Sequence, residues 1–288
     1  MVNVRQALVR YYNYTHSRFP LVPLALHCGL AALVLATISV SDPVASLWNG
    51  LIYLLFLLHM RVLDEYKDKS FDDHNYPDRP VQAGLVTLQE LKRIGWVNFG
   101  LMALLVLAQW PPAGWLIFIF AIGYSALMYR EFFIPRFWER SPAQYLLSHQ
   151  VVLLILFLGF LSRELGQAPP IRMLAAILFV YATVLIIELG RKVNRRYDPR
   201  GRETTDTYAF VWGSRLTLNL ISLAGAFAFL VAWWAGLIAA QGFFLGVGLY
   251  AAYYAASLLF EKTLTMHSRE ITFLVSLLQL LVYLVFQP

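Results

Sequence analysis

The sequence predicts an all-α membrane protein, a polytopic bundle of about nine transmembrane helices. Of its 288 residues 59% are hydrophobic and only 14% are charged, a balance that is too apolar for a soluble domain. Apolar stretches of about 20 residues, the length that crosses the hydrocarbon layer, follow one another along the chain. The polar connections between them are short, so we expect a single integral membrane domain over residues 1–288.

Nine apolar stretches are long enough to be transmembrane helices. In chain order they cover residues 20–40, 45–64, 89–109, 113–130, 144–162, 171–192, 213–235, 237–259 and 270–287. Because this number is odd, the two termini should lie on opposite sides of the membrane.

The basic residues test this count independently of hydropathy. With the N-terminus inside, 21 of the 23 lysines and arginines fall on the inner side, and only Arg163 and Arg172 fall outside, as the positive-inside rule expects. The N-terminal segment shows no small-residue cleavage site, so no removable signal peptide is expected. The net charge of +6 therefore reflects topology, and no nucleic-acid partner is expected. We predict a protein of the bacterial inner membrane, with its N-terminus and the loops near Asp72, Arg136 and Arg200 in the cytoplasm.

The first polar segment, residues 61–84, continues the second span and carries three regularly spaced acids. Asp64, Asp68 and Asp72 recur every fourth residue, which places them on one face of a helix. Carboxylates stacked in this way near a membrane repel one another, so a cation should compensate them. Mg²⁺ suits carboxylate oxygens and completes its shell with water and substrate phosphate. A diphosphate substrate would also meet Lys67 and Arg79. The alternative is a solvated loop whose acids pair with nearby lysines.

The second polar segment, residues 186–213, lies at the end of the sixth span. Glu188 and Lys192 are four residues apart at the expected inner membrane edge, where ionisable residues usually mark function. Glu188 and Asp198 are candidate metal ligands, Lys192 is a candidate diphosphate contact, and Asp206 offers a further oxygen. Here an ordinary helical ion pair inside a basic, topology-determining loop is a stronger alternative.

The histidines differ in what their surroundings indicate. His27 and His149 lie in apolar spans, where a bond to a neighbouring helix is the favoured interpretation. His74, beside Asp72, is a better candidate for the site. Some of the many aromatic rings could shield a carbocation, because aromatic faces attract cations.

The first polar segment resembles the UbiA superfamily of intramembrane prenyltransferases, whose first motif reads N-D-x-x-D-x-x-x-D followed by R-P. The matching residues here are Asp64-Glu65-x-x-Asp68-x-x-x-Asp72, then Arg79-Pro80 and Ala83-Gly84. The nine-helix fold of that family agrees with the span count, so the resemblance covers nearly the whole chain. The second motif, which is rich in aspartate in the family, differs here: Glu188 takes its first position and Lys192 replaces an acid or a small residue. This difference indicates a divergent branch.

The resemblance implies Mg²⁺-assisted ionisation of an isoprenyl diphosphate and capture of the allylic cation by a lipid-soluble or aromatic acceptor within the bilayer. Its site would use Asp68, Asp72 and Glu188 as catalytic metal ligands. The further metal ligands would be Asp64 and Asp198, and the diphosphate contacts would be Lys67, Arg79 and Lys192. A UbiA-type terpene cyclase is the alternative enzyme. A cation transporter is disfavoured, because the acids lie at helix ends and no internal repeat is evident.

Overall fold

The structure, a computed structural model, describes residues 4–38, 43–134 and 142–288. Within these ranges the chain is helical, and its only extended pairing is a single bridge between Tyr197 and Glu203. In the described chain eight helices are long and apolar enough to cross a membrane, and a bent pair near the N-terminus provides a ninth span. The predicted fold class and span count are therefore confirmed.

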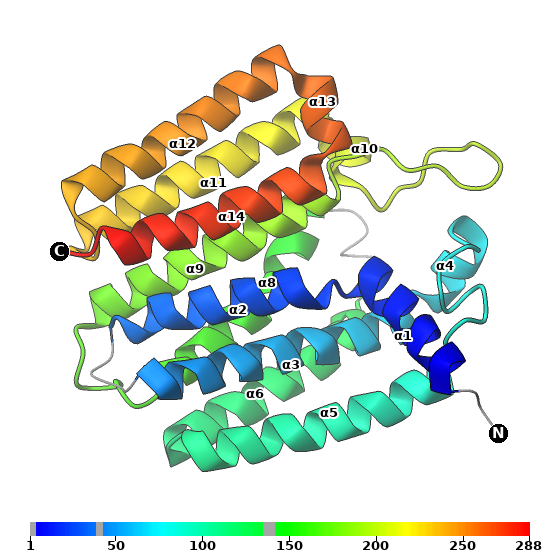
Figure 1. Cartoon of the computed structure of the whole chain (residues 1–288), viewed down its shortest axis with the longest axis horizontal. Helices are drawn as coiled ribbons and strands as arrows, with labels where there is room; N and C mark the ends of the chain where they lie inside the picture. Colours follow the sequence, from blue (N-terminus) through cyan, green and yellow to red (C-terminus); the bar gives the residue numbers. More distant parts are fainter. Residues whose placement is uncertain (1–3, 39–42, 135–141) are drawn as a thin grey trace.

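The long helices run side by side and alternate in direction (Figure 1). They are α2 (Leu21–Ala36), α3 (Pro43–Lys67), α5 (Leu88–Gln109), α6 (Pro112–Tyr129), α8 (Pro142–Phe160), α9 (Pro170–Arg191), α11 (Ser214–Trp234), α12 (Ala240–Leu259) and α14 (Ser268–Val285). Helix α1 (Val4–Arg18) precedes them, and short helices connect them: α4 (Lys69–Asn75), η1 (Glu131–Phe133), α10 (Tyr208–Trp212) and α13 (Glu261–Met266). Each predicted span matches one long helix, and no predicted end differs from the observed end by more than four residues. The largest difference is in α2, which was predicted to end at residue 40 and ends at Ala36.

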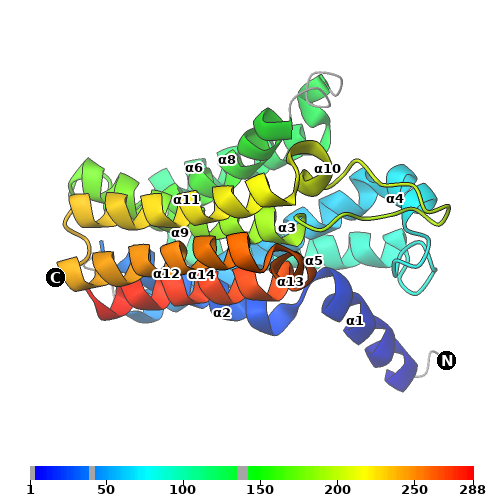
Figure 2. The same ribbon diagram turned by 90° about the horizontal axis from the view of Figure 1, so that it is seen from above.

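The first span bends where it enters the bundle. Helices α1 and α2 meet at 52°, and Pro20 lies at the junction with φ −64° and ψ 92°. Proline has no amide hydrogen to donate and disfavours helical backbone at the residue before it, here Phe19, so the helix is interrupted. As a result α1 projects away from the bundle axis (Figure 2).

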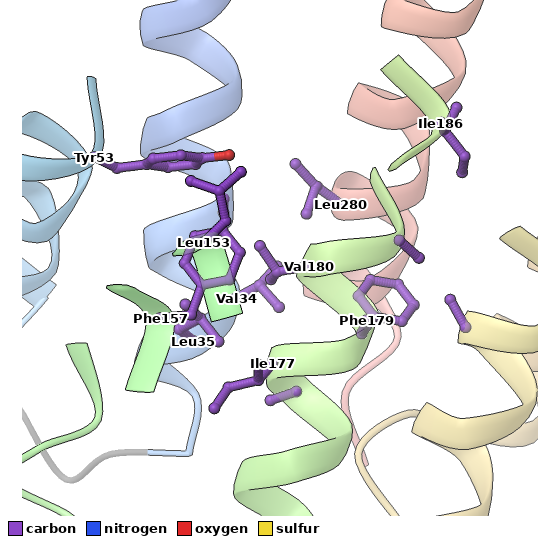
Figure 3. Close-up of a cluster of buried hydrophobic side chains, with 14 of the residues drawn as sticks. Val34, Leu35, Tyr53, Leu153, Phe157, Ile177, Phe179, Val180, Ile186 and Leu280 are labelled. Atoms are coloured by element: carbon purple, nitrogen blue, oxygen red, sulfur yellow. The ribbon is translucent and has the colours of Figure 1, made fainter. Parts of the chain in front are cut away.

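Helix α9 is the centre of the bundle. It packs against α2, α8, α11 and α14, and its Ile177, Phe179 and Val180 lie among side chains of the surrounding helices (Figure 3). Small residues allow these close approaches, as is usual between membrane helices: a β-carbon at Gly190 would lie 2.0 Å from Oγ1 of Thr272 on α14. The end of α9 that carries Glu188 is therefore held firmly by its neighbours.

Buried polar side chains join the helices inside the bundle. His27 Nε2 lies 2.9 Å from Thr183 Oγ1, which links α2 to α9. The Gln279 amide donates to the Phe179 carbonyl at 3.1 Å, and the Tyr250 hydroxyl donates to the same glutamine. His27 thus has the interhelical bond that was predicted for it.

Candidate active site

Both polar segments lie at the same end of the bundle. Helix α4 and the loop that leads to α10 extend beyond the long helices on the side of α1, whereas the C-terminus lies at the opposite end (Figures 1 and 2). This arrangement follows from the alternating spans, because α3 and α9 run in the same direction. Arg136, one of the three markers predicted to share this side, lies outside the described residues.

The three predicted acids of the first segment span a break between two helices. Helix α3 ends at Lys67 and α4 begins at Lys69, with Asp68 between them at φ −86° and ψ 0°. The amides of Asp68 and Asp72 still donate to carbonyls four residues earlier, at 2.9 and 2.8 Å. The predicted spacing of Asp64, Asp68 and Asp72 on successive turns is thus retained, although the segment is not one continuous helix.

Asp72 lies in a buried network of acids and arginines. It is 2% exposed and pairs with Arg79, and Arg18 Nη2 lies 3.5 Å from its Oδ2. Arg18 also pairs with Glu65 at 2.8 Å, and Arg61 approaches Glu65 at 3.2 Å. Arg18 and Glu65 were not predicted as members of this network. Arg18 comes from α1, and its only signal in the sequence is its position just before the first span.

Asp64 and Asp68 are paired much less directly. The shortest ion pair of Asp64, with Arg61, is 3.9 Å long, and the Asp68 carboxylate makes no ion pair or hydrogen bond within the described ranges, although its backbone groups are bonded. Burial, reinforced by the charges of Asp64 and Asp72, raises the pKa of Asp68 to about 6, although Lys67 and Arg61 act in the other direction. A cation bound here would relieve this cost of charging Asp68.

The donor chemistry at these two acids fits Mg²⁺. The ion commonly binds through one or two carboxylates and obtains its other oxygens from water and substrate phosphate. In the part of the chain that the structure describes, no three acids, histidines or cysteines are grouped closely enough to hold a metal by themselves. Substrate oxygens would therefore be needed to complete the shell.

Glu188 is fully engaged by neighbouring side chains. It pairs with Lys192 at 3.2 Å and with Arg191, and the Tyr208 hydroxyl donates to its Oε1 at 3.3 Å. The helical pair of Glu188 with Lys192 is thus present. Glu188 thus has three polar partners, all from its own segment.

Asp198 stabilises its own loop. Its Oδ1 accepts hydrogen bonds from the backbone amides of Arg200 and Arg202 at 2.9 and 2.8 Å, and the Arg202 guanidinium lies 2.7 Å from Oδ2. These contacts, led by the Arg202 amide, hold the pKa of Asp198 below its usual range. Its role as a metal ligand stays a prediction, and such a role would compete with these contacts.

Asp206 connects the two polar segments directly. The Tyr76 hydroxyl, from the loop after α4, donates to it at 2.6 Å, Thr204 donates at 2.7 Å, and Arg196 lies 3.1 Å away. Burial alone would raise the pKa of Asp206, but these three partners lower it. Nothing in the sequence spacing distinguished Asp206 from the other acids of its segment.

Lys67 lies in a second cluster that was not predicted. Its ammonium group is 3.0 Å from Glu131 and donates to the Tyr145 hydroxyl at 2.8 Å. His149 Nε2 lies 3.2 Å from the other oxygen of Glu131, so His149 contacts η1, the short turn that follows α6. Residues Glu131, Phe132 and Phe133 all have positive φ, at 48°, 51° and 61°. Left-handed backbone costs a side-chain-bearing residue roughly 1–2 kcal/mol, so packing must hold this turn in place.

His74 lies on the outer side of α4. Its Nδ1 is 2.8 Å from the Ser70 carbonyl of the same helix, and its side chain is exposed. Its predicted part in the site has no direct contact to support it in the described chain.

Comparisons with known proteins identify the kind of enzyme that this site belongs to. Residues 25–281 match the UbiA prenyltransferase family. The chain belongs to this family and is a UbiA-type prenyltransferase, an integral membrane enzyme of intramembrane prenyl transfer. A comparison with curated proteins finds no match.

A solved structure supports the fold. It comes from work on digeranylgeranylglyceryl phosphate synthase in membranes and aligns with a TM-score of 0.56 at 12% identity. The alignment covers 97% of this chain and 98% of that one. At this identity the similarity establishes the shared fold, and the predicted resemblance to UbiA proteins is confirmed by the family match.

Proposed function

We propose that the protein transfers an isoprenyl group from an isoprenyl diphosphate to a lipid-soluble or aromatic acceptor in a Mg²⁺-dependent reaction. The observation that carries this proposal is the meeting of the two polar segments at one end of an apolar bundle. The Tyr76 hydroxyl, from the first segment, donates a hydrogen bond to Asp206 of the second segment at 2.6 Å.

Asp64 and Asp68 are the residues best suited to receive the metal ion. Their carboxylates are the least directly paired of the predicted ligands. Asp72, Glu188 and Asp198 are further candidates, and each would first have to exchange an arginine or lysine partner for the ion. When bound, Mg²⁺ supplies electrostatic stabilisation of the charge that develops on the departing diphosphate.

The predicted diphosphate contacts are each neutralised by a carboxylate in this structure. Lys67 pairs with Glu131, Arg79 with Asp72, and Lys192 with Glu188. Diphosphate oxygens would replace these carboxylates as partners of the cations. The site therefore has its cations in place before substrate arrives, and the paired acids compensate their charge meanwhile.

The apolar bundle is suited to the isoprenyl tail, and aromatic side chains near it would tolerate a carbocation better than polar groups would. We propose that residues 1–288 act as one such domain in a bacterial inner membrane, with the polar end in the cytoplasm. The positive-inside distribution of the basic residues supports this orientation.

A purified protein incubated with Mg²⁺ and diphosphates of several chain lengths, followed by mass spectrometry, tests the proposal. Geranylgeranyl diphosphate belongs in the series because the structural neighbour's name contains that group. Release of diphosphate only when an acceptor is added would support transfer. A cyclised hydrocarbon formed without acceptor would instead support the cyclase alternative.

Absence of any product, together with Mg²⁺ flux into proteoliposomes, would replace both enzyme proposals with a transporter. Omission of the metal by chelation serves as the control, since the proposed reaction should stop without it.

A further inference from the structure

Lys67 differs from the other two predicted diphosphate contacts in the origin of its counter-ion. The acids that pair with Arg79 and Lys192 are themselves candidate metal ligands. Glu131, which pairs with Lys67 at 3.0 Å, comes from η1 and lies outside both acidic segments. A metal ion that drew Asp72 and Glu188 away from their cations would therefore leave the pair of Lys67 and Glu131 intact.

The turn that carries Glu131 is held in an unfavourable conformation. Three consecutive residues with side chains have left-handed φ. Phe132 packs edge-on against His149 and Tyr124, with ring centroids 5.8 and 5.3 Å away. Such conformations persist where surrounding contacts impose them, and they are frequent at functional sites. Here the contacts direct the Glu131 carboxylate at Lys67, whose side chain is 14% exposed.

Glu131 has a second polar neighbour besides Lys67. His149 Nε2 lies 3.2 Å from Glu131 Oε2, and Nδ1 of the same ring lies 2.9 Å from the Tyr145 carbonyl. A ring that carries its proton on Nε2 can donate it to the Glu131 carboxylate. If Lys67 turned away, Glu131 would keep this hydrogen-bonding neighbour.

The Lys67 ammonium group would have only a short distance to move from Glu131 toward the acids of the first segment. Lys67 and Asp64 line the same small cavity between α3, α6 and α8, together with His149 and Ser125. Lysine has a flexible stem with a compact charge, so its ammonium group can change partners without backbone movement.

We propose that Glu131 is an exchangeable counter-ion of Lys67 and sets the affinity of the site for diphosphate. This inference rests on the proposed function. Diphosphate carries more charge than a carboxylate and takes Lys67 from Glu131 when it binds. Glu131 recovers Lys67 when diphosphate leaves, and so speeds product release. No covalent step is involved.

The test is direct binding of inorganic diphosphate with Mg²⁺, measured by titration calorimetry on the purified full chain. Glu131→Gln removes the competing charge, so its dissociation constant should fall about fivefold, the equivalent of about 1 kcal/mol for a partly exposed ion pair. Glu131→Asp keeps the charge and should stay close to the wild type. Glu261→Gln is the matched control, because Glu261 pairs with Arg215 at 3.1 Å away from this cluster.

A double-mutant cycle shows whether the effect passes through Lys67. In a Lys67→Gln background, Glu131→Gln should change the dissociation constant less than twofold. His149→Phe should have the opposite effect, because Glu131 then loses a hydrogen-bonding neighbour, relies more on Lys67, and leaves diphosphate to bind more weakly.

Unchanged or weaker binding in Glu131→Gln would overturn the inference, and so would an equal gain in the Lys67→Gln background. If Glu131→Gln does not fold, as judged by gel filtration and circular dichroism, unchanged or tighter binding in His149→Phe overturns it instead. A wild-type chain that binds no diphosphate in the presence of Mg²⁺ would refute the proposed function itself.

Discussion

Replacing Asp68 by asparagine should stabilise the metal-free protein and abolish its turnover. Asp68 is the predicted ligand without an ion pair in the described chain, and its pKa is raised to about 6 from 3.8 by burial and by its acidic neighbours. Asparagine nearly preserves the shape and removes the charge. Folding then no longer has to force a carboxylate into an environment that disfavours it.

The size of the effect follows from the pKa shift. A raised carboxyl pKa means that the folded state binds more protons than the unfolded state between about pH 4 and pH 6, so this group lowers stability as the pH rises through that window. A shift of about two units corresponds to roughly 3 kcal/mol. Partial exposure of Asp68 to solvent reduces this, and we expect a gain of about 1–2 kcal/mol above pH 6.

Thermal unfolding in detergent with a chelator measures this gain as a higher Tm. The difference between Asp68→Asn and the wild type should be near zero at pH 4 and should reach its full value above pH 6. A variant that is less stable than the wild type at pH 7, or a difference that does not grow with pH, would refute the electrostatic reasoning. Full turnover by the variant would refute the metal-site assignment.

Four further predictions follow from the contacts at the polar end. Asp72→Asn should also abolish turnover but should lower the free energy of unfolding by about 2 kcal/mol, because two partly buried arginines lose a charged partner; a Tm above that of the wild type would contradict this. Tyr76→Phe removes the bond between the two loops and should raise the KM for the diphosphate several-fold with little change in Tm, and an unaltered KM would mean that the loops need no such link. Glu188→Gln should raise the Mg²⁺ concentration needed for half-maximal rate, whereas Lys192→Met should mainly weaken diphosphate binding; near-normal kinetics in both would confine the site to the first segment. A cysteine introduced at Arg200 should react with an impermeant reagent only from the cytoplasmic side, since the native cysteine is buried, and labelling from outside alone would reverse the predicted orientation.

The transmembrane spans were predictable because the bilayer requires about 20 mostly apolar residues per helix, and individual polar residues do not obscure a pattern of that length. The bend at Pro20 also has a local cause in the sequence. The end of α3 was harder to predict from the sequence. The four-residue spacing of its acids predicted one continuous helix, whereas the helix is interrupted at Asp68 and a new helix begins at Lys69. Spacing alone does not reveal such a break.

The partners of the charged residues depended on contacts distant in sequence. Arg18 reaches Asp72, Lys67 reaches Glu131, and Tyr76 reaches Asp206 at 2.6 Å. Each of these pairs depends on how the helices pack, so the local sequence around either residue does not predict it. Composition could place the charges at one end of the bundle, but only the packed fold shows which acid faces which base.

The separation between the polar end and the C-terminus has a practical consequence. Helix α14 ends at Val285 on the far side of the bundle (Figure 1), and its 18 residues alone span about 27 Å. A fluorescent reporter or a surface tether attached after α14 would therefore stand clear of the candidate active site. Molecules immobilised in this way would all present the polar end to the solution, which suits single-molecule or flow-cell measurements of a membrane enzyme.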